Sequence, residues 1–152
     1  MKIGIISDTH DNLVKIREAV KIFNEHEVDF VFHAGDFIAP FSLDPFQELR
    51  CDWAGVFGNN DGEKEGLSKK SGGRIKPPPL LWEVQEKKIA VTHQFSPVEA
   101  QIIISGHTHH PQIEKVGDKL LINPGEACGW LTEKSSLVIL DLQSLDPKLV
   151  YF

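Results

Sequence analysis

In the first half of the chain, short continuous apolar runs typical of strands alternate with segments whose apolar residues recur at helical spacing. KIGII (2–6) is a short, continuous apolar run typical of a buried strand, whereas NLVKIREAVKIFNEH (12–26) repeats its apolar residues at helical spacing. VDFVFH (28–33) predicts a second strand, FSLDPFQELR (41–50) a short helix and WAGVF (53–57) a third strand. The front half is therefore predicted to alternate as βαβαβ.

The pattern changes in the second half, where short apolar runs follow one another without helical spacing. Seven strands are predicted there: LLWEV (80–84), KIAVT (88–92), QIIIS (101–105), QIEKV (112–116), KLLIN (119–123), SSLVILDL (135–142) and KLVYF (148–152). Alternating βα units followed by a run of strands are typical of two packed sheets with helices outside. We therefore predict an α/β fold, a four-layer αββα sandwich of two mixed β-sheets flanked by helices, as a single domain over residues 1–152.

One stretch departs from both patterns. GEKEGLSKKSGGRIKPPP (62–79) is rich in glycine, lysine and proline, and it predicts a long exposed loop. Its basic residues would either gather an anionic substrate or simply be solvated, and solvation is the simpler expectation. These residues are Lys69, Lys70, Arg74 and Lys76.

Composition narrows the functional class. The 152 residues are 41% hydrophobic, enough for one core, and 22 acidic against 16 basic residues leave a formal charge of −6. Such a surface repels polyanions, so non-specific nucleic-acid binding is disfavoured. Cys51 and Cys128 match no metal-finger spacing, and no apolar run resembles a signal sequence or approaches the roughly 18 residues of a membrane span. We expect a cytoplasmic protein without a membrane partner.

Polar side chains gather where the predicted strands end. SDTHDN follows the first strand, HAGDF the second and GNND the third, while THQ and GHTHH follow two strands of the second half. Sites in open α/β sheets lie outside the carboxyl ends of strands, so these five clusters are predicted to converge. Their donors are oxygen and nitrogen atoms with no thiolate, an inventory typical of a metal site. They are Asp8, His10, Asp36, Asn59, His93, His107 and His109.

Spacing within the clusters supports this interpretation. Asp8 and His10, like His107 and His109, are two residues apart, so in extended backbone both side chains face one side. They would then serve one centre or two adjacent ones. Two cations about 3.5–4 Å apart need a bridging carboxylate, and Asp36 is the natural candidate. Because only two carboxylates would face four positive charges, the resulting positive field suits a phosphate ester.

Each cluster taken alone has an ordinary structural explanation. Asp-x-His is often a turn or a helix cap, GNND is a good hairpin turn, and His93 alone would be a hydrogen-bonded core histidine. A histidine-rich tract such as GHTHH can be a surface feature. Only the combination, with each cluster at a strand end, favours a functional site.

In chain order, SDTHDN, HAGDF, GNNDG, VTH, SGHTHH and INPGE resemble the motif string of the calcineurin-like metallophosphoesterase superfamily, D-x-H, G-D, G-N-H/C-D, H-G-H and G-H-x-H. The likeness is greatest to its small bacterial and archaeal phosphodiesterases and to the retromer subunit VPS29. It implies that a metal-bridging hydroxide attacks phosphorus in line. It implies one metal on Asp8, His10, Asp36 and His109, and a second on Asp36, Asn59, His93 and His107.

The resemblance implies a divalent-metal-dependent phosphodiesterase that acts on a small or nucleotide-like phosphodiester with two metal ions. Manganese is the ion it suggests, although nickel, zinc, iron and cobalt suit the same ligands. The alternative is a catalytically weak, metal-binding scaffold for protein–protein interaction, like VPS29. A DNA-repair nuclease is disfavoured by the acidic balance. Aromatic residues such as Trp130 and Phe95 would serve a homo-oligomer interface or a substrate pocket.

Three features depart from the family pattern. Asn60 stands where many active members have a histidine that protonates the leaving group, so that role would be missing or would pass to Asp61 or another group. Phe95 replaces the second histidine of H-G-H, which predicts a less polar pocket. FSPVEAQ is short for the usual helix, which predicts a bare crossover and an open flank. Of the remaining histidines, His33 is expected to be structural and His110 an exposed neighbour.

Overall fold

The apolar runs of the first half become the parallel strands of the first sheet, which the computed structural model of residues 1–152 orders as β11-β10-β1-β2-β3-β4. β1 to β4 run parallel, while β10 pairs antiparallel with both β1 and β11. The carboxyl ends of the parallel strands therefore meet at one edge. The strands are β1 (Lys2–Ile6), β2 (Phe30–His33), β3 (Asp52–Val56), β4 (Ile75–Lys76), β10 (Ser136–Asp141) and β11 (Asp146–Tyr151).

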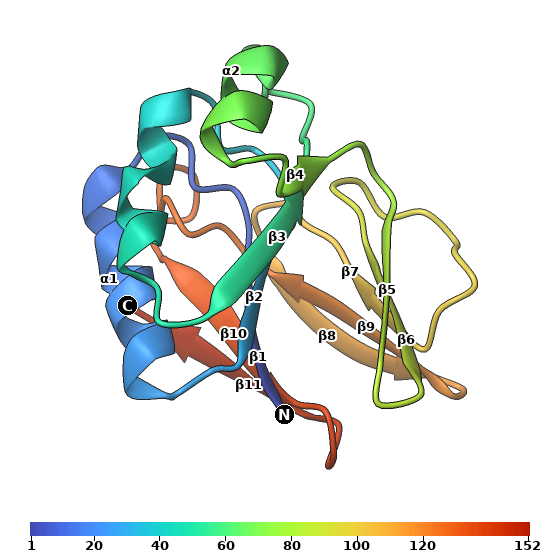
Figure 1. Cartoon of the computed structure of the whole chain (residues 1–152). Helices are drawn as coiled ribbons and strands as arrows, with labels where there is room; N and C mark the ends of the chain where they lie inside the picture. The colour runs from blue at the N-terminus through green and yellow to red at the C-terminus, as the bar shows by residue number, and fades with distance from the viewer.

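The second sheet has the order β5-β6-β7-β9-β8 and is also mixed. Its three central strands are parallel, and β5 and β8 close its edges in antiparallel pairing. The strands are β5 (Leu80–Val84), β6 (Lys87–Val91), β7 (Ile102–Ile104), β8 (Pro111–Val116) and β9 (Lys119–Pro124). Figure 1 shows the two sheets facing each other, with the loops that follow β1, β2 and β3 at their upper end.

Apolar side chains from both sheets fill the space between them. Ile3, Ile5 and Phe32 of the first sheet pack in one buried cluster with Ile102 and Ile104 of the second. Burying each such side chain contributes roughly 1.5–3 kcal/mol. Because each sheet end is fixed by this core, the loops at the carboxyl ends of the strands start from rigid positions.

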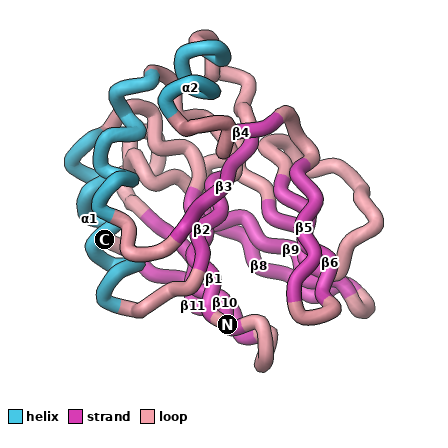
Figure 2. The backbone as a smooth tube through the Cα atoms, viewed as in Figure 1, coloured by secondary structure: helices cyan, strands magenta, loops and turns pink.

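Helices cover only the outer face of the first sheet (Figure 2). α1 (Leu13–Glu25) begins at Asn12, whose side chain accepts a hydrogen bond from the Lys15 amide at 3.3 Å, and buries Ile16 and Phe23 against the sheet. The segment expected as a short helix at 41–50 forms the 3-10 helix η1 (Pro40–Glu48), which contains a proline that cannot donate a backbone hydrogen bond. Helix formation there is confirmed, with the tighter geometry as the difference.

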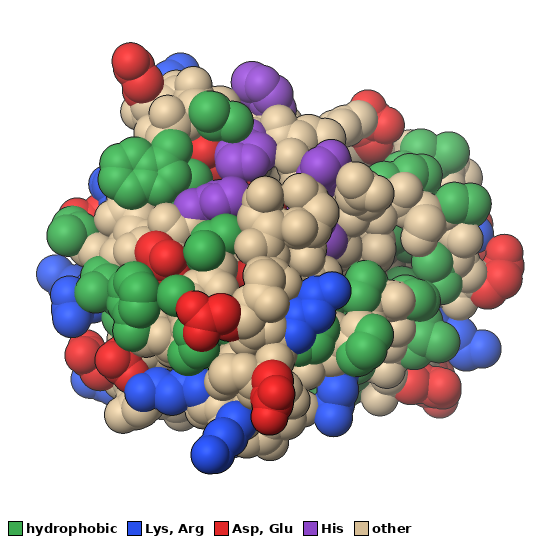
Figure 3. Space-filling view, turned by 90° about the horizontal axis from the view of Figure 1, so that it is seen from above, with side chains coloured by type: hydrophobic (Ala, Val, Ile, Leu, Met, Phe, Trp, Pro, Cys, Tyr) green, Lys and Arg blue, Asp and Glu red, His purple; other side chains and the backbone are tan.

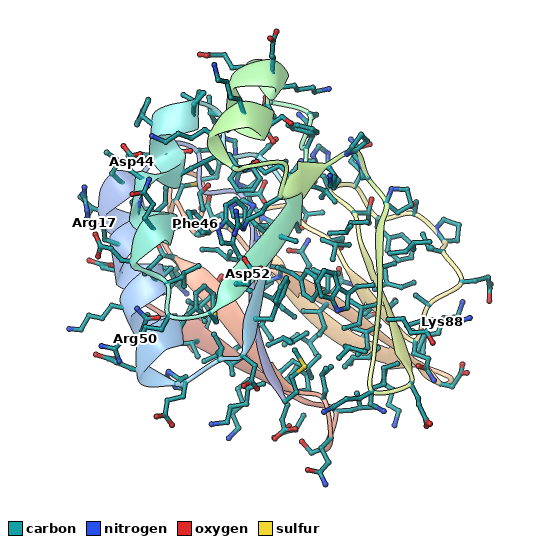
Figure 4. All side chains as sticks on the ribbon, in the orientation of Figure 1. Arg17, Asp44, Phe46, Arg50, Asp52 and Lys88 are labelled. Atoms are coloured by element: carbon teal, nitrogen blue, oxygen red, sulfur yellow. The ribbon has the colours of Figure 1, made fainter.

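Side chains of this helical layer divide cleanly between core and solvent. Phe46 points from η1 toward the first sheet, whereas Arg17 and Arg50 point away from it (Figure 4). Two pairs of opposite charge, Lys70 with Asp44 and Arg74 with Asp52, lie on the same side at 2.6 and 2.9 Å. Lys70 and Arg74 therefore form ordinary ion pairs at the surface.

The prediction of one long loop over 62–79 is wrong. This segment contains α2 (Lys64–Lys70) and β4, and only its ends are loop. Two apolar residues anchor this lysine- and glycine-rich segment to the protein, since Leu67 and Ile75 are buried in the core under the helices. β4 also pairs with β3 at the edge of the sheet. A segment dominated by polar residues is thus ordered by two anchors and one short strand pairing.

The predicted α/β fold of two mixed sheets is confirmed, with helices on the outer face of the first sheet alone (Figure 2), which leaves three layers where four were expected. The outer face of the second sheet carries no helix, because the segment between β6 and β7 is a bare crossover, as its short length predicts. This crossover forms the loop at the right of Figure 1. No helix combines the length and the apolar character that crossing a bilayer requires.

Candidate metal centre

The seven predicted ligands come together at the upper end of the two sheets. Asp8 and His10 follow β1, Asp36 follows β2, Asn59 follows β3, and the remaining three histidines follow β6 and β7. Figure 3, which looks down on this end, shows histidine side chains gathered over the middle of the molecule. Five segments far apart in sequence thus supply one polar site.

The first ligand set consists of Asp8, His10 and His109. His109 Nε2 lies 3.6 Å and His10 Nε2 3.8 Å from Asp8 Oδ1, and the two imidazole centroids are 5.2 Å apart. Asp8 is fully buried, and the two histidine side chains are 14% and 19% exposed. Their donor atoms are close enough to hold one ion.

The second ligand set consists of Asn59, His93 and His107, and it is more open to solvent. Asn59 Oδ1 lies 2.8 Å from His93 Nε2 and 2.9 Å from His107 Nδ1. His93 is buried, whereas Asn59 and His107 are exposed. The Asn59 amide oxygen therefore lies between two imidazole nitrogens, as expected if all three groups bind the same cation.

Asp36 joins the two sets. Its Oδ2 lies 3.4 Å from His10 Nε2 and 3.4 Å from His93 Nε2. The loop after β1 is tied to it, since the backbone amides of Thr9 and His10 both donate to the Asp36 carbonyl. A single buried carboxylate thus faces both groups of histidines.

The backbone at the site is unusual. Non-glycine residues rarely adopt positive φ, and such outliers gather at functional sites because the surrounding structure must enforce them. Five of the seven predicted ligands have this geometry, with φ of 52° for Asp8, 38° for His10, 61° for Asp36, 69° for His107 and 63° for His109. The sharp turns after the strands aim these side chains into one space.

Close backbone approach also requires glycine beside two of the ligands. A Cβ at Gly106 would lie 2.7 Å from Asp8 Oδ2, and one at Gly58 would clash with the Asp36 carboxylate. Both carboxylates therefore pack directly against the backbone of a glycine, where any side chain would clash.

The electrostatics of the site favour positive charge. Burial would raise the pKa of Asp36, but His93 and two hydrogen bonds from Asn60 hold it below its ordinary range. Burial would lower the pKa of His10 and of His93, yet the neighbouring carboxylates Asp8 and Asp36 raise both above the ordinary value. The Asp36 carboxylate therefore stays ionised, and a cation placed beside it is stabilised.

The donor set fits a divalent cation. Asp8 Oδ1 and His10 Nε2 are buried and have no hydrogen-bond partner, although an unpaired buried polar atom costs about 1–3 kcal/mol. Both atoms belong to the first ligand set, where a cation would satisfy them together. The nearby Cys128 donates its thiol to Glu126, and burial raises its pKa to about 12. The donors of the two ligand sets themselves are oxygen and nitrogen.

Glu126 is a functional residue that the sequence did not reveal. It is fully buried, and its Oε2 lies 2.7 Å from His109 Nδ1. Its other oxygen accepts from the amide and the hydroxyl of Thr132. Burial would raise the pKa of Glu126, but the hydrogen bonds with His109 and Thr132 lower it to about 2. With Nδ1 held by this carboxylate, Nε2 of His109 faces the site. Glu126 ends the INPGE motif, so this turn reaches the centre through His109.

Asn60 and Asp61, the two expected participants beside Asn59, face different ways. Asn60 Nδ2 donates to Asp36 Oδ2 at 2.7 Å, so its amide lies at the junction of the two sets. Asp61 is buried and accepts from the backbone amides of Asp36, Ile38 and Gly58 at 2.7–3.1 Å. These contacts hold the Asp61 carboxylate against the backbone around Asp36 and Gly58. That Asp61 takes over protonation of the leaving group stays a prediction.

Two other histidines stay outside the ligand sets. His33 is fully buried, stacks on Phe37, accepts from the Gly35 amide with Nδ1 and lies 3.1 Å from the Thr9 hydroxyl with Nε2. Burial drives the pKa of His33 well below its ordinary value, so it supports the loop after β1 as a neutral ring. His110 is exposed.

Comparison with known proteins adds independent information. A family model described as the calcineurin-like phosphoesterase superfamily domain matches residues 1–145. The chain is 41% identical to a phosphodiesterase from Methanocaldococcus jannaschii, with 94% of each chain covered. Since this similarity extends over almost the entire length, it includes both ligand sets.

Solved structures give the same picture. The chain resembles the structure of an archaeal phosphodiesterase with a TM-score of 0.91 and 36% identity, covering 100% of both chains. It also resembles wild-type Vps29 from Entamoeba histolytica in complex with Zn²⁺, with a TM-score of 0.70 and 17% identity, covering 100% of this chain and 98% of the other. The second likeness concerns the fold alone.

Proposed function

The chain belongs to the calcineurin-like phosphoesterase superfamily, and from that premise we propose that it is a divalent-metal-dependent phosphodiesterase with a dinuclear centre. The observation that carries the proposal is the position of Asp36, whose Oδ2 lies 3.4 Å from a histidine of each ligand set. One carboxylate facing two sets is what a pair of adjacent cations requires. Activity on diesters is supported by the similarity to the phosphodiesterase from M. jannaschii.

Two divalent cations, when bound, would stabilise charge on the phosphoryl oxygens and provide a nucleophile near neutral pH. Manganese is our expected ion, and the Zn²⁺ complex of the Vps29 neighbour makes zinc the first alternative to test. The first ion would be held by Asp8, His10, Asp36 and His109, and the second by Asp36, Asn59, His93 and His107. Since both halves of the chain supply ligands, residues 1–152 would act as a single domain.

The chain's own residues would orient these groups and the substrate. Glu126 fixes the ring of His109 so that Nε2 faces the centre, and Asp61 holds the backbone around Asp36. The exposed amide of Asn60, which donates one N–H to Asp36 Oδ2, would donate its other N–H to a phosphoryl oxygen. An amide cannot supply a proton near neutral pH, so esters whose leaving group departs as a stable anion should react fastest.

A metal-binding scaffold for a protein partner is the second candidate. It is favoured by two exposed apolar side chains, Trp130 at 63% and Leu131 at 73% exposure. Both lie beside the centre, since Trp130 Nε1 donates to the His10 carbonyl and the Leu131 amide donates to Glu126. The complete ligand set is unnecessary for a scaffold, and for this reason the enzyme is our first choice. Both candidates are compatible with a cytoplasmic location, which stays a prediction.

Hydrolysis by chelator-stripped protein tests the proposal. Bis-p-nitrophenyl phosphate and p-nitrophenyl phosphate would be supplied with and without Mn²⁺, Ni²⁺ or Zn²⁺, and the His110→Ala variant would serve as a matched control. We expect metal-dependent cleavage that favours the diester, in both proteins. Two bound metals per chain without any cleavage would contradict the enzyme and favour the scaffold.

A further inference from the structure

A pocket of about 320 Å³ opens directly beside the second ligand set, with His107 in its wall. Its floor is the outer face of β8 and β9, where Gln112 lies opposite Asn123 and Glu114 opposite Leu121. Residues opposite each other in antiparallel strands share a face, so these four side chains line one surface. The pocket therefore runs from the centre along the second sheet.

The bare crossover between β6 and β7 leaves this surface open. A helix there would cover the outer face of the sheet, but residues 92–101 contain none. Instead, Phe95 of the crossover forms one wall with its side chain 58% exposed. An aromatic ring thus faces solvent at the rim of a pocket, next to a candidate metal ligand.

The lining combines a flat apolar contact with directed polar groups. Phe95 and the half-buried Leu121 offer the faces on which a planar ring can stack. Glu114 Oε1 accepts from Gln112 Nε2 at 2.9 Å, and its second oxygen is available to a ligand donor because both side chains are exposed. A carboxylate repels anionic groups and accepts hydrogen bonds, so the pocket favours a planar group that has no negative charge and carries an N–H donor.

We propose that this pocket binds the base of a nucleoside phosphodiester, namely a purine with an exocyclic amino group, while the phosphate lies at the metal ligands. The inference rests on the proposed function and names its substrate class. The base stacks on Phe95, and its amino group donates to Glu114. If the purine has a carbonyl oxygen in place of the amino group, this acceptor faces the acceptor oxygen of Glu114, and the base binds less well.

Three p-nitrophenyl diesters with the same leaving group test the pocket: the esters of adenosine 5′-monophosphate, inosine 5′-monophosphate and methyl phosphate. In metal-loaded wild type we expect kcat/KM for the adenosine ester to exceed that for the methyl ester by about tenfold, since stacking on an aromatic ring supplies this much. Phe95→Ala should remove most of that ratio. Glu114→Gln should bring the adenosine-to-inosine ratio close to one.

Matched controls are Phe41→Ala and Glu99→Gln, which change an exposed phenylalanine and an exposed glutamate outside the pocket. Both ratios should stay at the wild-type values in these variants. Equal kcat/KM for the adenosine and methyl esters in wild type, or an unchanged ratio in Phe95→Ala, would overturn the proposal.

A binding measurement separates this proposal from the proposed function. If wild type hydrolyses none of the three esters, the phosphodiesterase assignment fails, and the pocket is then judged by saturation-transfer NMR on metal-free protein with adenosine 5′-monophosphate. Transfer to the adenine protons that is lost in Phe95→Ala supports the pocket. No transfer in wild type contradicts it.

Discussion

The two ligand sets that meet at Asp36 differ in how their polar atoms are satisfied. In the first set, Asp8 Oδ1 and His10 Nε2 are buried without a hydrogen-bond partner. In the second set, Asn59 Oδ1 lies within 2.9 Å of both His93 and His107, so these groups already satisfy one another. A cation entering the first set relieves an existing penalty, whereas one entering the second must replace hydrogen bonds.

Support from the surrounding fold differs in the same direction. His109 of the first set is held by the buried Glu126, and the loop that carries His10 rests on His33. In the second set, the exposed His107 has its remaining ring nitrogen 3.2 Å from the exposed Gln94. We therefore expect the first set to bind its cation more tightly and the second to exchange its cation more readily.

Removing the shared carboxylate should have the largest effect. Asp36→Asn takes one negative charge from both sets, so we expect hydrolysis to fall by at least about 10³-fold and metal content to fall from two ions per chain to at most one. The measurement is kcat/KM for bis-p-nitrophenyl phosphate together with metal analysis after dialysis. Full activity in this variant would exclude Asp36 as the bridge.

Weakening the support of only one set should separate the two binding steps. Glu126→Gln keeps an acceptor for His109 but loses the charge, so we expect metal affinity at the first set to drop about 10–100-fold while the second step changes little. Calorimetric titration of chelator-stripped protein measures both steps, with Glu133→Gln in the same loop as control. Equal weakening of both steps would contradict the assignment of Glu126 to one set.

Adding an acid beside the shared carboxylate should sharpen the account of leaving groups. Asn60→His supplies a group that can protonate a departing oxygen, so hydrolysis of the poor leaving group phenol should rise by about tenfold or more. Hydrolysis of the p-nitrophenyl diester should rise much less. If both esters gain equally, proton transfer is not what limits the wild-type reaction.

The smallest effect concerns the support under the first set. His33 has a depressed pKa when folded, so only the unfolded chain takes up this proton as pH falls through about 6.5. Stability from the neutral ring is complete above that pH and is lost below it, by about 1.4 kcal/mol at pH 5.5. Urea unfolding from pH 7.5 to 5.5 measures the free energy of unfolding of wild type and of His33→Gln. The difference between the two curves isolates His33, because the other histidines contribute equally to both. Parallel curves would contradict a neutral buried His33.

Much of the fold and of the site was predictable because both depend on local patterns. Continuous apolar runs predicted the strands, and the family resemblance found in SDTHDN, HAGDF and GHTHH is confirmed by the family match over residues 1–145. The polar clusters converge because parallel strands end at one edge of a sheet. The assignment of each ligand to a metal stays a prediction.

What the sequence did not reveal depends on contacts between distant segments. Glu126 was missed because it meets His109 only once β9 and the loop after β7 are folded together. α2 was missed because a helix in a lysine- and glycine-rich stretch forms only when Leu67 finds the core. In both cases the deciding partner lies elsewhere in the chain.

Electron paramagnetic resonance of chelator-stripped protein titrated with Mn²⁺ tests the central claim most directly, because it reports whether two ions share a ligand. We predict that the first equivalent gives the spectrum of an isolated ion in the first set. The second equivalent should replace it with the spectrum of a spin-coupled pair, and Asp36→Asn should abolish that change. Two independent signals that simply add would contradict a centre joined by Asp36.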